Sequence, residues 1–139
     1  MKLKNNIPKE LIESAVKFHG HLGPFLILGL KAGLYANEVL GRDPFGMKVI
    51  VETEPKPPPS CFVDGVQFTT GCTMGKGNIE LKSGEGLSAI FTRNGRKIKL
   101  NLKEELYESL RRCSKDDLER IALDISKKPI YTIFNVKNE

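Results

Sequence analysis

The chain contains two histidines, His19 and His21, and a single glycine separates them. Residues two positions apart point to the same side in an extended segment, and Gly20 gives the backbone between them the freedom to adopt one. The pair could therefore bind one ion. Because Pro24 follows and begins an apolar stretch, the histidines should lie at the entrance of a helix, where backbone N–H groups lack partners. Such a place suits a metal or an anion.

Cysteines could complete a metal site with these histidines. Cys61 and Cys72 are eleven residues apart, so an unbroken helix would turn both the same way but hold them about 16 Å from each other, which one ion cannot bridge. Either Gly71 ends the helix and turns Cys72 back, or one cysteine alone joins the histidines, and Cys61 is then the firmer candidate. A His/His/Cys set with an open fourth position is typical of catalytic or exchangeable zinc, and iron is also compatible with such ligands.

Polar residues near Cys61 could act on a ligand. Asp64 and Gln67 could orient a ligand or support the metal ligands, and Asp64 is also a candidate general acid or base. Lys76 lies in a glycine-rich segment that could bind a small anionic substrate, although a tight connection between a helix and a strand explains the glycines equally well. The candidate ligand contacts are Gln67, Thr70, Gly75 and Lys76.

The glycine-rich segment differs from a phosphate-binding P-loop at two positions. Thr70 stands where the pattern requires its first glycine, and Gly77 replaces the Ser or Thr that would hold magnesium. These differences exclude a P-loop nucleotide hydrolase.

The apolar pattern predicts the elements that must position these residues. Periodic spacing predicts helices over residues 7–18 and 24–40 and a short helix after Cys61, and further helices are marked by start signals at Asn101 and Ser114. Asn94-Gly95 predicts a two-residue hairpin turn, and the prolines of residues 55–59 predict a stiff, extended connector. The predicted strands are residues 46–54, 79–81, 87–93, 96–100 and 130–136.

Composition limits the remaining possibilities. The chain has 139 residues, a common size for one domain, so we expect residues 1–139 to form a single domain. Its net charge of +5 is spread out and argues only weakly for nucleic acid. We find no signal peptide or membrane span, and three widely spaced cysteines favour reduced thiols in the cytoplasm.

Two motifs resemble those of the formylmethanofuran dehydrogenase FmdE family. They are Phe18-His19-Gly20-His21-Leu22-Gly23-Pro24 and the segment from Cys61 to Asn78, which contains Asp64-Gly65, Gln67, Thr70-Gly71-Cys72-Thr73 and Gly75-Lys76-Gly77-Asn78. The resemblance implies an α+β domain with a mixed sheet packed with helices and a core order of helix, strand, helix and three strands, here followed by extra C-terminal helices. It also implies a homodimer and a metal-associated pocket built from both motifs, with His19, His21, Cys61 and Cys72 as candidate ligands.

The chain departs from the family pattern in two places. Many members have a cysteine two positions after the second histidine, where this chain has Gly23, so the first motif can supply nitrogen ligands only. Many also carry a C-terminal zinc ribbon of paired CxxC motifs, whereas Cys113 is the one cysteine beyond the second motif here. Its position near the end of a predicted helix favours a bystander over a reactive thiol.

Three functional hypotheses follow. The first is a small cytoplasmic metal-binding protein that serves a redox or one-carbon enzyme system as an accessory component, with zinc as the favoured ion. The second is a stand-alone metal-dependent enzyme in which Asp64 is the acid or base and Lys76 holds a small anionic substrate. The third and weakest is a nucleic-acid-binding module that uses the basic hairpin of residues 93–99.

Overall fold

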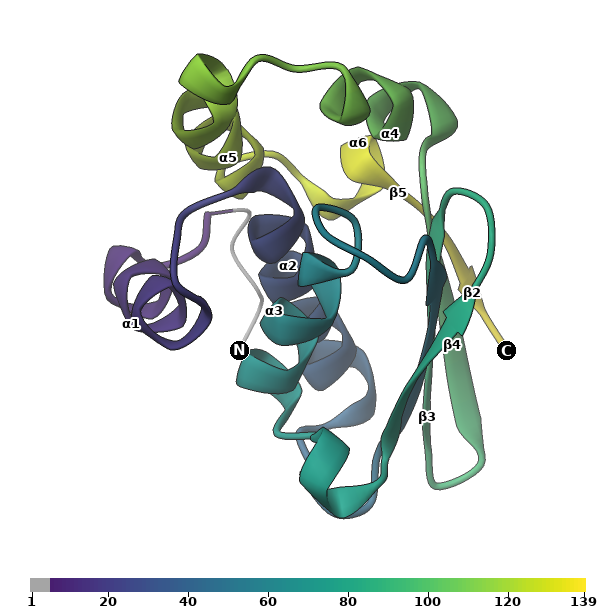
Figure 1. Cartoon of the computed structure of the whole chain (residues 1–139). Helices are drawn as coiled ribbons and strands as arrows, with labels where there is room; N and C mark the ends of the chain where they lie inside the picture. The colour runs from purple at the N-terminus through teal and green to yellow at the C-terminus, as the bar shows by residue number, and fades with distance from the viewer. Residues whose placement is uncertain (1–5) are drawn as a thin grey trace.

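The computed structural model describes residues 6–139 and has the predicted α+β architecture (Figure 1). A mixed five-stranded sheet forms one layer, and its strands follow the order β2-β1-β3-β4-β5. β1 and β2 are parallel, and the other neighbouring strands are antiparallel. The strands are β1 (Lys48–Thr53), β2 (Ile79–Ser83), β3 (Leu87–Arg93), β4 (Arg96–Leu102) and β5 (Phe134–Asn138).

Helices cover one face of this sheet (Figure 1). The central helix, α2, is apolar almost throughout and is buried along most of its length, as the sequence predicted. α3 packs beside it, α1 lies on the outer side of this pair, and α4, α5 and α6 gather at one end of the molecule. The helices are α1 (Lys9–His19), α2 (Pro24–Leu40), α3 (Cys61–Thr70), α4 (Glu104–Arg111), α5 (Leu118–Ser126) and α6 (Ile130–Ile133), with short 3-10 turns η1 (Met74–Lys76) and η2 (Lys115–Asp117).

Glycines allow α2 and α3 to approach closely. A Cβ atom added to Gly29 would lie 2.2 Å from the backbone oxygen of Phe62, and one added to Gly65 would lie 2.4 Å from the backbone oxygen of Leu26. Gly33 faces Thr69 in the same interface. The expectation that Gly29 and Gly33 admit a neighbouring backbone is therefore confirmed, and this contact fixes the position of α3.

The predicted hairpin turn between β3 and β4 is also confirmed. Asn94 and Gly95 have φ angles of 52° and 78°, the left-handed pair that a two-residue hairpin requires. The antiparallel register continues up to the turn, where Arg93 pairs with Arg96.

Replacing Gly95 should destabilise the protein through its backbone alone. Nothing lies within 4 Å of an added Cβ atom, so Gly95→Ala tests conformational strain without a clash, and we expect it to lower the free energy of unfolding by about 1–2 kcal/mol. Gly75→Ala is the matched control, because Gly75 has no positive φ and a Cβ there would meet its nearest neighbour at 3.9 Å. Urea unfolding of both variants measures the difference, and equal midpoints would contradict this interpretation.

Three local predictions were wrong. The proline-rich segment of residues 55–59 forms turns that lead into α3, with Ser60 donating to Lys56 and Cys61 to Pro58, because the fixed φ of proline also suits a first helical turn. Asn101 does not start a helix, since it still pairs with Asn135 in the sheet. The predicted last strand, residues 130–136, begins instead with the helical turn α6, and β5 starts at Phe134.

None of the helices within residues 6–139 combines the length and the apolar character needed to cross a membrane.

Candidate metal centre

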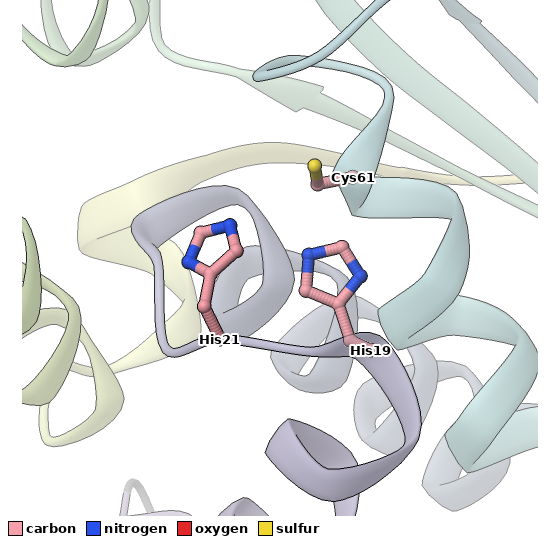
Figure 2. Close-up of side chains that lie close together, drawn as sticks. All are labelled: His19, His21 and Cys61. Atoms are coloured by element: carbon pink, nitrogen blue, oxygen red, sulfur yellow. The ribbon is translucent and has the colours of Figure 1, made fainter.

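His19, His21 and Cys61 come together in the structure. His19 is the last residue of α1, His21 lies in the link to α2, and Cys61 is the first residue of α3. The three potential ligand atoms lie within 4.8 Å of one another, so the group could hold a metal ion. Each imidazole turns one nitrogen toward the space beside the Cys61 sulfur (Figure 2). The bend that brings the histidines together occurs at Gly20, whose φ is +120°.

An acidic side chain orients the His19 ring. Nδ1 of His19 lies 2.6 Å from a carboxylate oxygen of Asp64, one turn after Cys61 on α3. With the proton on Nδ1, that nitrogen donates to Asp64 and leaves the lone pair of Nε2 free to coordinate. A carboxylate behind a metal-binding histidine is a recurrent arrangement, because it fixes the tautomer and makes the ligand more basic.

The other nitrogen of His19 fits a bound ion. Nε2 is buried and has no hydrogen-bond partner within the described residues, and the His19 side chain is 8% exposed. A buried polar atom without a partner is costly, so a group that satisfies Nε2 would stabilise this arrangement. A metal ion held with His21 and Cys61 would do so.

The Cys61 thiol is half-buried beside this nitrogen. Burial, and secondarily the Asp64 carboxylate, raises the pKa of the Cys61 thiol above its ordinary value. The thiol therefore keeps its proton at neutral pH in the absence of a cation, and metal binding must displace that proton. A cation next to the sulfur would offset both unfavourable contributions.

A small cavity of about 180 Å³ adjoins the three residues. Its walls are largely apolar and come from the start of α2, from Pro58 and from the segment that follows α4. The lining residues are His19, His21, Gly23, Pro24, Phe25, Leu26, Pro58, Cys61, Leu110, Arg111, Cys113, Lys115 and Leu118. An ion at the three ligands would thus face a space large enough for a small molecule.

Cys72 is not brought to the histidines. α3 ends at Thr70, Gly71 follows with a φ of +78°, and Cys72 is fully buried, with its thiol donating to the backbone oxygen of Met47 at 3.4 Å. Of the two sequence alternatives, the one in which Cys61 alone accompanies the histidines matches this geometry. Gly71 ends the helix as expected, but the turn directs Cys72 into the core.

The other candidate ligand contacts lie toward the far end of α3 from Cys61. The Gln67 side chain accepts from the backbone N–H of Met74, and Thr70 donates to Val66 and accepts from the N–H of Cys72. Gly75 and Lys76 form the exposed turn η1, where Lys76 Nζ donates to Thr73 at 3.2 Å and lies 5.2 Å from the ring centre of Phe45. These contacts support the alternative interpretation of a tight connection between α3 and β2.

The basic hairpin is partly structural. Arg93 donates to Asp43 at 3.1 Å and to the backbone oxygen of Leu40 at 2.7 Å, and Lys97 lies 3.9 Å from Glu139. Contacts of this kind anchor the hairpin and lower its free positive charge, which weakens the nucleic-acid hypothesis.

Sequence reasoning missed the cavity wall formed after α4. It gave Arg111 and Lys115 no role and treated Cys113 as a bystander, yet all three line the cavity beside Cys61. Nothing in their local sequence links them to the histidines, because tertiary packing alone brings together segments about ninety residues apart.

Comparisons with known proteins agree with this architecture. A family model described as "FmdE, Molybdenum formylmethanofuran dehydrogenase operon" matches residues 18–134. The crystal structure of a tungsten formylmethanofuran dehydrogenase FmdE-like protein from Syntrophus aciditrophicus has a TM-score of 0.70 and 22% identity, covering 100% of this chain and 77% of that one. At this identity the likeness concerns the fold.

A curated relative adds a different name. A protein of Archaeoglobus fulgidus called a probable S-adenosyl-L-methionine-binding protein is 37% identical over 76 residues, which are 50% of this chain and 19% of that protein. The chain thus spans about a fifth of the length of this relative.

Proposed function

The chain belongs to the FmdE family, and on this premise we propose that it is a metal-binding accessory protein whose ion is held by His19, His21 and Cys61. Three protein ligands leave one position of a tetrahedral ion open. The ion we favour is zinc, which accepts mixed nitrogen and sulfur ligands without a geometric preference of its own, and iron is the second choice.

One observation carries this proposal. Nε2 of His19 is buried without a partner in the described part of the chain, while Nδ1 of the same ring is held by Asp64. A histidine that serves only the core would pair both nitrogens or expose one of them to solvent. The exposed nitrogen of His21 and the sulfur of Cys61 lie on the unpaired side.

The accessory role rests on family membership. The family description refers to the molybdenum formylmethanofuran dehydrogenase operon, which supports association with a redox enzyme of one-carbon metabolism. A homodimer, a larger complex and a cytoplasmic location belong to the same proposal. We do not extend S-adenosylmethionine binding to this chain, because the matched region covers 19% of the relative that bears this name.

A stand-alone enzyme is the second candidate, and the cavity beside the ligands favours it. A bound ion with an open position would polarise a substrate oxygen or activate water. The roles first considered for two residues receive less support, because Asp64 is engaged with His19 and Lys76 lies near the opposite end of α3. Asp64 fits a positioning role better than that of acid or base.

Metal analysis tests the proposal. Protein purified without added metal, then loaded with zinc and freed of excess, should retain one ion per chain. Cys61→Ser should lose most of this zinc, and Cys113→Ser is the matched control that should keep it, because Cys113 lines the cavity but lies outside the ligand group. Equal zinc contents in the two variants would contradict the assignment.

The role of Asp64 leads to a separate prediction. Asp64→Asn should weaken zinc binding by about 10–100-fold, because it removes the charge that holds the His19 tautomer. Asp43→Asn is a suitable control, since the Asp43 side chain is similarly exposed, at 35% against 38%, but is bonded to Arg93. Competition with a chromophoric chelator measures both affinities, and an unchanged affinity in Asp64→Asn would show that the carboxylate is dispensable.

A further inference from the structure

The cavity beside the three ligands ends on the first turn of α2. Gly23, Pro24, Phe25 and Leu26 contribute to its lining, and α2 is 17 residues long. No side chain caps this end of the helix, and its first turn contains no acidic residue. The partial positive charge at the helix N-terminus is therefore left uncompensated by the helix itself.

Two buried backbone N–H groups at this end have no partner. Ile27 donates to the oxygen of Gly23 at 3.2 Å, and Pro24 has no N–H, but neither Phe25 nor Leu26 forms a backbone N–H hydrogen bond within residues 6–139. Phe25 is 3% exposed and Leu26 is 0% exposed. An unpaired buried N–H group costs roughly 1–3 kcal/mol, so an acceptor in the cavity would be stabilising.

A third unpaired polar atom belongs to the same cavity. His19 contributes to the lining, its side chain is 8% exposed, and its Nε2 has no partner among the described residues. This atom is independent of the helix terminus, because it comes from the end of α1. Two elements thus direct unsatisfied polar groups toward one small space.

The charged residues at the cavity also favour an anion. Lys115 lines it and has no carboxylate within 4.0 Å in the described chain, whereas Arg111 is paired with Glu54 at 3.6 Å. The Asp64 carboxylate is bonded to Nδ1 of His19, on the opposite side of the ring from Nε2. An ion at the three ligands would make the cavity more positive still.

We propose that this cavity binds a small carboxylate, with an oxygen accepting from the N–H groups of Phe25 and Leu26 and with Lys115 at the mouth. The volume of 180 Å³ has room for about six groups the size of a water molecule. The apolar side chains of Leu110 and Leu118 then face the alkyl part. The inference extends the proposed function to the extent that a metal at His19, His21 and Cys61 offers a second contact for the same anion.

The size of the cavity separates this ligand class from a larger one. Sites for drug-sized ligands enclose roughly 300–1,000 Å³, so this cavity is too small for S-adenosylmethionine.

Amide NMR spectra of the full chain, metal-free and zinc-loaded, test the proposal with acetate as the probe. Titration at constant ionic strength should shift the Phe25 and Leu26 amide resonances to saturation in both forms. Acetamide, which has the same size and no charge, should leave them unchanged. Lys115→Ala should weaken acetate binding about two- to fivefold, as expected for an exposed charge, while Lys82→Ala on β2 should have no effect.

The outcomes distinguish this proposal from the metal assignment. Saturable shifts at Phe25 and Leu26 in a chain that binds no zinc would support the anion site and overturn the proposed function. Zinc binding without such shifts in either form, or equal shifts with acetamide, would overturn the anion site alone and indicate that water fills the cavity. Shifts confined to surface lysines would overturn it as well.

Discussion

His19→Ala is expected to reduce zinc affinity by at least about 100-fold, because loss of a residue that merely supports a ligand already costs 10–100-fold. The variant removes both the unpaired Nε2 and the contact of Nδ1 with Asp64. Competition with a chromophoric chelator at fixed pH measures the change. An affinity within a few-fold of the original protein would exclude His19 as a ligand.

A fold control accompanies the His19 measurement. The side chain is mostly buried, so its removal could disturb the end of α1 as well as the site. Circular dichroism and thermal unfolding of the metal-free variant detect such a disturbance. Phe18→Ala is a matched neighbour, because Phe18 is 56% exposed and packs on Phe68 rather than on the ligands, so zinc affinity should be retained.

Gly65→Ala should have the largest effect on stability. The added Cβ atom would lie 2.4 Å from the oxygen of Leu26 and 2.7 Å from the nitrogen of Leu30, and backbone atoms cannot move aside as a flexible side chain can. We expect a loss of about 3 kcal/mol or more in the free energy of unfolding, at the upper end of the usual cost of overpacking. Chemical denaturation measures it against Gly75→Ala, which should change little.

The same substitution should reach the metal site if the variant stays folded. Gly65 lies one turn after Cys61 and next to Asp64, so a shift of α3 away from α2 moves a ligand and the residue that orients another. Zinc affinity should therefore fall together with stability. Wild-type stability in Gly65→Ala would contradict the close contact between α2 and α3.

Local patterns in the sequence were sufficient for much of the fold. Asn94-Gly95 predicted the hairpin because few residues adopt two successive positive φ angles, and Gly29 and Gly33 predicted a close helix contact because both lie on one face of α2. The proline-rich segment misled because proline suits both an extended chain and a first helical turn, and the neighbouring packing decides between them.

The candidate site was predictable only in part. Cys61 and the histidines could be grouped from the two motifs, but the fate of Cys72 depended on the direction in which the chain leaves Gly71, which no local pattern specifies. The support of His19 by Asp64 joins residues 45 positions apart, and support of a metal ligand was only one of several roles that the sequence allowed for Asp64. The wall after α4 could not be predicted, because it depends on how the C-terminal helices pack at the start of α2.

X-ray absorption fine structure at the zinc edge of the loaded protein tests the metal centre most directly. We expect one sulfur at about 2.3 Å, two imidazole nitrogens at about 2.0–2.1 Å and one further light atom. Two sulfurs would mean that Cys72 or Cys113 joins the site, and a sulfur-free shell would mean that Cys61 does not. Either result would contradict a centre formed by His19, His21 and Cys61.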